Sequence, residues 1–265
     1  MMRERHDVIV LLFALAAVFI IAMLFLPVIN LLFSAGFEGL IQAIRDKNAW
    51  KAIFVSFEAA FFATFLSFIL GTPLAYLLAR KRFPGKNLVE SIIDLPIVIP
   101  HTVAGIALLL VLGRNGLIGA SFNKFGMRLA DSMAGIVAAM MFISAPFFIN
   151  HAREGFESVD PRMENVAMSL GATRAKAMVT ITFPLSLRNM FVGAIMTWAR
   201  AISEFGAVIV IAYFPMVAPT YIYSRYIEYG LSQAIPVAAL LLLICVSIFI
   251  VLRAIAERWR RYDKD

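Results

Sequence analysis

Six long apolar segments constrain this chain more than any other feature of its sequence. They lie at residues 8–33, 53–79, 91–112, 132–151, 187–213 and 234–256. Each has about the 20 residues that an α-helix needs to cross the hydrocarbon core of a bilayer. Since 62% of the 265 residues are hydrophobic, well above the share that is usual in soluble domains, the sequence predicts an all-α integral membrane protein with six transmembrane helices.

The composition also narrows the classes of function. The formal net charge is +7, but the basic residues lie in short clusters beside apolar segments and form no single basic face, so no nucleic acid partner is expected. Cys245 is the only cysteine, and His6, His101 and His151 are far apart in the sequence. We therefore expect no metal site and no cofactor bound by this chain. No internal repeat or low-complexity linker is visible, which favours a single transmembrane domain over residues 1–265.

The distribution of lysine and arginine predicts the orientation of the chain in the membrane. Sixteen of the 24 basic residues lie at the two termini and in the second and fourth connections, whereas the other three connections hold seven. The terminal ones are Arg3, Arg5, Arg253, Arg258, Arg260, Arg261 and Lys264. Because positive residues tend to stay in the cytoplasm, we expect a multi-pass protein of the cell membrane with both termini and the fourth connection cytoplasmic.

The fourth connection, at about 152–186, is a polar, cationic island between two apolar segments. Asp160 and Pro161 are typical of a helix start, and Gly171 suits the helix end. A second short helix is expected, capped by Thr173 and ended by Pro184. The first helix carries an apolar stripe of Met163, Val166, Ala167 and Leu170, opposite Arg162, Glu164, Asn165 and Ser169. Periodicity alone leaves open whether such a helix lies in the lipid headgroups or docks on another protein.

The order of residues in this loop resembles the cytoplasmic loop of ABC importer permeases. The residues that carry the resemblance are Glu164, Ala167, Gly171, Ile181, Phe183 and Pro184. Phe183 stands where leucine is usual, and the spacing from Glu164 to Gly171 is one residue longer than in the commonest form of the motif. The longer form is similar to the branch of the family that transports molybdate, tungstate and sulfate.

The resemblance implies a type I ABC importer permease fold, in which the loop between the fourth and fifth transmembrane helices forms a coupling helix. Such a helix sits in a groove of a separate ATPase subunit. The residues expected at this contact are Glu164, Ala167, Leu170, Gly171, Ile181 and Pro184. The implied partners are a second copy of the chain, two cytoplasmic ATPase subunits and an external substrate-binding protein.

The third and fifth segments carry the features expected of a transport pathway. Pro96 and Pro100 predict a bent or broken third helix, because proline removes backbone donors. In the fifth segment, Arg200 and Glu204 lie within apolar sequence, where a charge costs about 2.5–3.5 kcal/mol if it faces lipid. Four residues apart, they can neutralise each other in an ion pair, line a path, or do both.

Both segments also resemble the corresponding helices of oxyanion permeases, on residues 94–105, 116–119 and 198–215. The resemblance implies that the fifth helix lines the route and contributes to its gate. The residues expected there are Thr102, Arg200, Ser203, Glu204 and Gly206, with His101 as a further candidate. The tyrosines at 214–233 are interpreted either as an interfacial belt or as a contact for the external binding protein.

The function implied by the resemblance is that of the permease subunit of an ATP-driven importer for an oxyanion. Molybdate or tungstate is the expected cargo, and sulfate or thiosulfate is the nearest alternative. The sequence has no G-x-x-x-x-G-K-[ST] phosphate loop, so the chain is not expected to be an enzyme, and ATP and magnesium are expected on the separate ATPase. A stand-alone secondary transporter is the other class considered, although neither inverted repeats nor coupling-ion sites are visible.

Overall fold

The structure of this protein, a computed structural model, describes residues 2–262, with side chains described at residues 9–256 and 258. In this part of the chain every regular element is helical, which confirms the all-α prediction. The side chains of Arg3, Arg5, Arg260, Arg261 and Lys264, on which the predicted orientation partly rests, lie outside the described residues. The chain forms two compact units, residues 1–49 with 222–243 and residues 50–221 with 244–265. The prediction of one domain for the whole chain stays a prediction.

Five helices in the described residues are long and apolar enough to cross a membrane. They lie at Ile9–Arg45, Lys47–Arg80, Met133–Ser158, Arg174–Ile202 and Leu231–Ala256.

A further pair of helices meets the same test only as one bent unit. Helices α3 (Lys86–Val98) and α4 (His101–Leu112) are bent by 113° relative to each other, and counting them as one span gives six spans. The bend falls at Ile99 and Pro100, one of the two prolines from which the sequence predicts a bend, because proline cannot continue the hydrogen-bond ladder of the preceding helix. The other proline, Pro96, lies inside α3.

The smaller unit joins the first helix to the start of the last. Helix α1 (Met2–Arg45) changes direction at Gly36, whose φ of 60° favours glycine. The next turn approaches α12 (Leu231–Tyr262) closely, since a Cβ placed on Gly39 would lie 3.2 Å from Cγ of Pro236. Helix α11 (Ala218–Tyr229) contributes Arg225, whose guanidinium lies 3.7 Å from the Asp46 carboxylate. A close helix contact and an ion pair therefore stabilise this unit.

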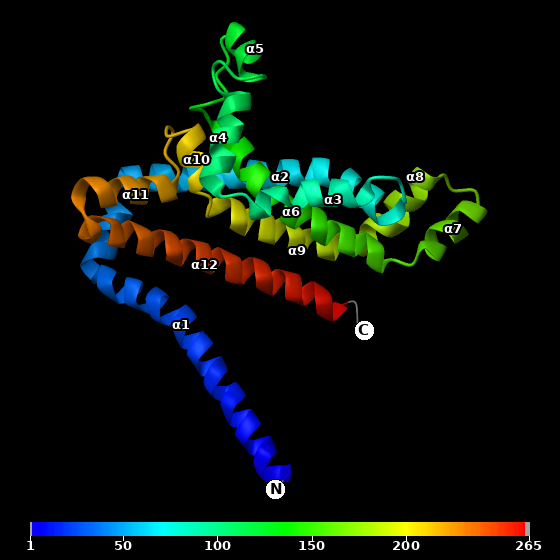
Figure 1. Cartoon of the computed structure of the whole chain (residues 1–265), viewed down its shortest axis with the longest axis horizontal. Coiled ribbons are helices and arrows are strands. Elements are labelled where there is room, and N and C mark those ends of the chain that lie inside the picture. Colours follow the sequence, from blue (N-terminus) through cyan, green and yellow to red (C-terminus); the bar gives the residue numbers. More distant parts are fainter. Residues whose placement is uncertain (1, 263–265) are drawn as a thin grey trace. The chain divides into compact units, whose positions relative to one another are not determined.

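The larger unit is a bundle in which α2 (Lys47–Arg80), α6 (Met133–Ser158) and α9 (Phe183–Ile202) run alongside one another (Figure 1). Small side chains let membrane helices pack closely, where no hydrophobic force drives one helix onto another. One cluster of the core contains many fully buried alanines, namely Ala59, Ala60, Ala63, Ala104, Ala139, Ala201, Ala207 and Ala212. A second cluster, around Phe148, Phe156 and Met190, fills the other end of the same bundle.

Short elements connect these helices. Helix α5 (Gly119–Lys124) follows α4, and Ser132 then starts α6 by accepting a hydrogen bond from the Gly135 amide at 3.3 Å. The loop after α6 holds α7 (Pro161–Ser169), α8 (Arg174–Ala177) and the π-helical turn η1 (Met178–Thr182). Helix α10 (Gly206–Ile211) follows α9.

Two predictions about the ends of the fourth connection and the fifth segment are wrong. The sequence predicts one helix over 187–213, but α9 ends at Ile202 and α10 begins at Gly206. The Glu204 carboxylate accepts the Ala207 amide at 2.8 Å, so a side chain replaces the backbone acceptor there. Pro184 does not end the preceding helix, because α8 continues through η1 into α9. Pro184 then lies in the first turn of α9, where the absence of its amide costs least.

The contact between α6 and α9 generates a prediction about stability. A Cβ on Gly193 would lie 2.8 Å from Cβ of His151, so Gly193→Val should overpack the contact and lower the free energy of unfolding by about 1–3 kcal/mol. Thermal unfolding of the detergent-solubilised protein measures this change. Met196→Val, at an exposed position of the same helix, should change stability by less than about 0.5 kcal/mol. Equal effects of the two substitutions would contradict the close contact.

Candidate functional site

The loop helix α7 forms as its sequence predicts. The Asp160 side chain accepts a hydrogen bond from the Arg162 amide at 2.8 Å, and Pro161 occupies the first turn. The helix stops before Gly171, whose φ of 91° reverses the chain in a conformation that side chains disfavour. Thr173 caps α8 by accepting a hydrogen bond from the Lys176 amide at 3.3 Å. The two predicted helix starts and the glycine stop are therefore confirmed.

Three of the four apolar stripe residues of α7 are exposed. Met163 is 45% exposed, Val166 is 60% exposed and Leu170 is 84% exposed, whereas Glu164 is only 6% exposed. A helix on a protein surface normally buries its apolar face and leaves its charges in water. Helix α7 instead exposes three of its apolar side chains and buries Glu164, so a partner or a lipid surface can contact the apolar side chains.

The buried Glu164 carboxylate fixes this orientation. It accepts hydrogen bonds from Thr182 Oγ1 at 2.6 Å, from Arg80 Nε at 2.9 Å and from the Tyr76 hydroxyl at 3.1 Å. Arg80 also donates through Nη2 to the Val159 carbonyl at 2.9 Å. A buried carboxylate is costly unless it is paired and hydrogen-bonded, and Glu164 has both kinds of partner. The end of α2 and the end of the π-helical turn η1 are thereby joined to α7.

The same surroundings set the acidity of Glu164. Burial alone would raise its pKa, but the hydrogen bonds from Thr182 and Arg80 and the positive charge of Arg80 outweigh burial and hold the pKa below its ordinary value. The carboxylate is therefore ionised whenever the loop is folded at neutral pH.

The other residues expected at the loop contact lie around this anchor. Ala167 and Ile181 are half-buried, and Pro184 is exposed at the start of α9. Gly171 is exposed, and no atom lies within 4 Å of the position that its Cβ would take. The backbone at Gly171 is therefore open to close approach from outside.

A second polar cluster lies in the larger unit, where the end of α9, the start of α10 and the start of α4 meet. Arg200 Nη2 lies 2.8 Å from Oε2 of Glu204, so the ion pair predicted from the sequence is present. Nδ1 of His101, at the start of α4, lies 2.8 Å from the same Glu204 oxygen, and Arg200 Nη2 lies 2.9 Å from each nitrogen of the His101 ring. The side chain of Glu204 is fully buried, while those of Arg200 and His101 are partly exposed. The buried carboxylate of Glu204 therefore contacts both the Arg200 guanidinium and the His101 ring, which reach the surface.

Two glycines bring α4 and α10 together at this cluster. A Cβ on Gly206 would lie 2.7 Å from Cβ of His101, and a Cβ on Gly105 would lie 2.8 Å from the Ala207 carbonyl oxygen. Gly206 therefore permits the close approach that places His101 against Glu204. Of the other residues expected at the pathway, Ser203 donates to the Arg200 carbonyl at 3.0 Å, and Thr102 is exposed beside His101.

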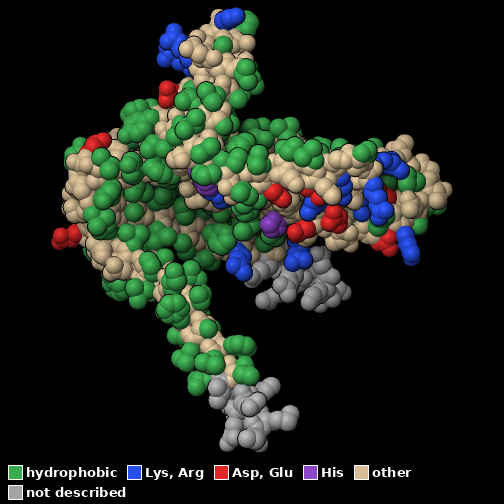
Figure 2. All heavy atoms as spheres, viewed as in Figure 1, with side chains coloured by type: hydrophobic (Ala, Val, Ile, Leu, Met, Phe, Trp, Pro, Cys, Tyr) green, Lys and Arg blue, Asp and Glu red, His purple; other side chains and the backbone are tan. Residues whose placement is uncertain are grey.

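A band of charged side chains over α3 and α6 is missed by the sequence analysis. Asn150 donates to Asp94 at 2.8 Å, and Arg153 Nη1 lies 2.8 Å from Glu90. Figure 2 shows histidine, acidic and basic side chains gathered across an otherwise hydrophobic face, and the band extends toward the α7–α8 end. The signal available in the sequence is that Glu90, Asp94 and Arg153 border two apolar segments, but their pairing depends on how α3 packs against α6.

Comparison with known proteins decides the family. Residues 71–261 match the family described as "binding-protein-dependent transport system inner membrane component". The chain belongs to this family. It is 41% identical, over 96% of its length and 98% of the relative, to the molybdate/tungstate transport system permease protein of Thermococcus kodakarensis. It is 30% identical, over 94% of its length and 89% of the relative, to the sulfate transport system permease protein of Synechocystis sp..

A solved structure supports the fold of this permease. It is a bacterial alginate ABC transporter in complex with an alginate pentasaccharide-bound periplasmic protein. The match has a TM-score of 0.72 at 18% sequence identity and covers 95% of this chain and 94% of that chain. The permease is therefore a multi-pass membrane subunit of an ABC transport system and not itself an enzyme, since the ATPase of such systems is a separate subunit.

The Glu164 anchor generates a prediction about the loop. Glu164→Gln leaves the Arg80 guanidinium buried without its carboxylate, so the free energy of local opening of residues 160–182 should fall by about 3 kcal/mol. Amide hydrogen exchange measures this quantity. Arg162→Gln, on the exposed face of α7, should leave exchange unchanged. Equal protection in the Glu164→Gln variant would contradict the anchor.

The lowered pKa of Glu164 fixes the sign of the pH dependence. A carboxyl whose pKa is lower in the folded loop than in the unfolded chain stabilises the loop above the unfolded pKa, which is about 4.3. This contribution is lost as pH falls through the lower, folded pKa. Exchange protection of residues 160–182 should therefore be constant near neutral pH and fall in that acidic window, and Glu164→Gln should remove this part of the pH dependence.

Proposed function

We propose that this permease moves a tetrahedral oxyanion, molybdate or tungstate, across the cell membrane, driven by two ATPase subunits. The choice of cargo is supported by the 41% identity to a permease named for molybdate and tungstate. Sulfate is the second candidate, because the permease is also 30% identical to a protein named for sulfate transport. The three anions share shape and charge and differ chiefly in size, so selection among them belongs to the external binding protein.

The observation that carries the proposal is the exposed apolar face of α7 on its buried polar anchor. We propose that Met163, Val166 and Leu170 insert into a groove of the ATPase subunit, where they leave water. Gly171 offers open backbone at the end of that face, and Ala167, Ile181 and Pro184 border it. Because Glu164 ties α7 to α2 through Arg80, motion of the ATPase would pass directly to a membrane-spanning helix.

This docking requires that the loop and both termini lie in the cytoplasm, as the distribution of basic residues predicts. ATP and magnesium are proposed to bind to the two ATPase subunits. One permease chain offers one such helix, so two copies of the permease would face the two ATPase subunits. An external binding protein would deliver the anion on the opposite side.

The cluster at Arg200 is proposed to line the pathway. The Arg200 guanidinium is paired with the negatively charged carboxylate oxygens of Glu204. An oxyanion presents similar negatively charged oxygens, so a passing anion would compete with Glu204 for the guanidinium. His101 lies against the same Glu204 oxygen and would keep that carboxylate partnered when Arg200 turns to the anion. The competition keeps binding weak, which transport requires, because a deep energy well would trap the ion. Closure of the ATPases would move the α7 helices and open the path to one side of the membrane at a time.

The docking proposal predicts the effect of a charge on α7. Leu170→Asp should reduce the affinity of the ATPase subunit by about tenfold or more, because it places an unpaired carboxylate in an apolar groove. Copurification and substrate-stimulated ATP hydrolysis measure the effect. Ser169→Asp places the same charge on the exposed neighbouring position off the apolar stripe and should have little effect. Normal copurification and coupling of Leu170→Asp would contradict the proposal.

The pathway proposal predicts a loss of transport without a loss of assembly. Arg200→Gln should lower uptake into vesicles reconstituted with the ATPase and binding protein by about tenfold, since it removes a charge-assisted contact. Arg200→Lys keeps the charge and should retain part of the uptake. Unchanged uptake in Arg200→Gln would remove this residue from the pathway.

A further inference from the structure

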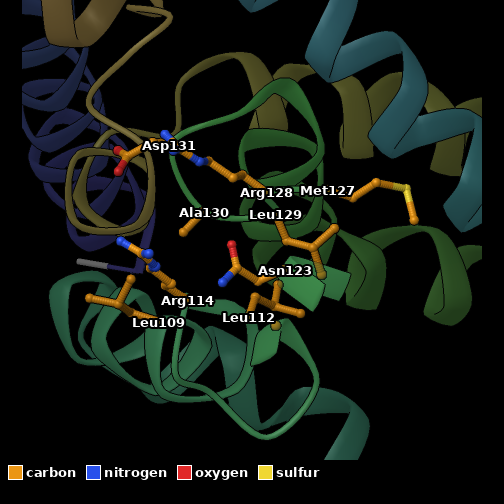
Figure 3. A pocket seen from close by; sticks show the side chains of 10 residues that line it. Leu109, Leu112, Arg114, Asn123, Met127, Arg128, Leu129, Ala130 and Asp131 are labelled. Atoms are coloured by element: carbon orange, nitrogen blue, oxygen red, sulfur yellow. The ribbon is translucent and has the colours of Figure 1, made fainter. Parts of the chain in front are cut away.

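A cavity of about 330 Å³ lies between the end of α4 and the start of α6 (Figure 3). Its volume is at the lower end of the range for small-molecule sites. The residues that line it come from the last turn of α4 and the turn that follows it, from α5 and from the segment before α6. They are Leu109, Leu112, Arg114, Gly119, Asn123, Met127, Arg128, Leu129, Ala130 and Asp131. None of them belongs to the polar cluster at Glu164 or to the polar cluster at Glu204.

The polar lining of this cavity suits an oxyanion. Figure 3 shows the side chains of Arg114, Asn123 and Arg128 around the same hollow. Among the residues that the structure describes, neither guanidinium makes an ion pair, so both groups keep their donors available. A guanidinium presents paired N–H groups that match two oxygens of one anion, and the Asn123 amide can supply another donor.

Asp131 anchors one side of the cavity to α10 and lowers the net positive charge of the cavity lining. Its amide donates to the carbonyl of Ile211 at 3.0 Å, which joins the cavity to the end of α10. Its φ of 52° is one that asparagine and aspartate adopt more readily than other side chains. Because its carboxylate lines the same cavity as Arg114 and Arg128, the three side chains together carry one net positive charge. An anion would be attracted there but held weakly.

We propose that this cavity is a low-affinity binding site for a free tetrahedral oxyanion, occupied before the anion reaches Arg200. The inference rests on the proposed function and extends it by naming a site of capture at the far end of α10. The connection between α4 and α6 is expected on the outer side of the membrane, because the three connections assigned to that side together hold seven basic residues, against sixteen at the termini and in the other two connections. A cationic site there raises the local concentration of the anion at the entrance.

Binding of the free anion tests the proposal directly. Equilibrium dialysis of radiolabelled molybdate against the purified permease–ATPase complex, without the binding protein, should show weak, salt-sensitive binding. Arg114→Gln and Arg128→Gln should each weaken it about fivefold. Asp131→Asn keeps a residue that tolerates the backbone conformation and should tighten binding by a similar factor. Lys124→Gln removes an equal charge from the same segment outside the cavity and should have no effect.

Uptake with the binding protein present separates this inference from the proposed function. The expected result is that Arg128→Gln raises the molybdate concentration for half-maximal uptake, whereas Lys124→Gln does not. No molybdate or tungstate uptake by the unmodified system would overturn the proposed function. Normal uptake together with equal behaviour of Arg128→Gln and Lys124→Gln would overturn only the cavity site. A third result would also show that the cavity proposal is wrong: the arginine variants change only the affinity for the binding protein, and free molybdate does not bind. The arginines would then pair with carboxylates of the binding protein.

Discussion

The burial of one carboxylate determines which surface of the loop is left for a partner. Thr182, Arg80 and Tyr76 donate hydrogen bonds to Glu164, and these contacts turn Glu164 inward while most of the apolar stripe of α7 stays exposed. Any other orientation of α7 would break this ion pair and leave a buried charge without a partner. The free-energy cost of that unpaired charge holds the helix in its orientation. The ion pair with Arg80 also joins the loop to the end of a membrane-spanning helix. One interaction therefore both presents the proposed docking face and connects it to the part of the protein that must move.

The same physical constraint shapes the interior of the bundle. A carboxylate within apolar sequence must find partners in the protein, and Glu204 finds Arg200, His101 and the amide of Ala207. The last of these contacts accompanies the break between α9 and α10. The carboxylate of Glu204 thus supplies a hydrogen-bond acceptor for a backbone amide at the helix break. Non-helical backbone within a membrane protein is tolerated only where its polar groups find such partners. Close packing of α4 against α10, permitted by Gly105 and Gly206, brings the three polar side chains together.

Much of the fold follows from sequence, and the exceptions have physical reasons. Length and apolarity identify the spanning segments, Pro100 locates the bend before His101, and local capping residues locate α7 and α8. The helical period finds the apolar stripe of α7 but not its direction, because burial of Glu164 depends on residues 84 and 88 positions away. The break after Ile202 is missed since a side chain, not a proline or glycine, replaces the helix bond. The pairs of Glu90 and Asp94 with α6 likewise depend on tertiary packing.

The account depends most on the claim that the exposed face of α7 is covered by an ATPase subunit on the inner side of the membrane. A single cysteine placed at Leu170, with Cys245 replaced by serine, allows this claim to be measured by labelling with a membrane-impermeant maleimide. The account predicts rapid labelling in inside-out vesicles that contain the permease alone, protection when the ATPase subunit is added, and no labelling from the opposite side. Labelling from the outer side, or labelling in inside-out vesicles that the ATPase does not change, would contradict it.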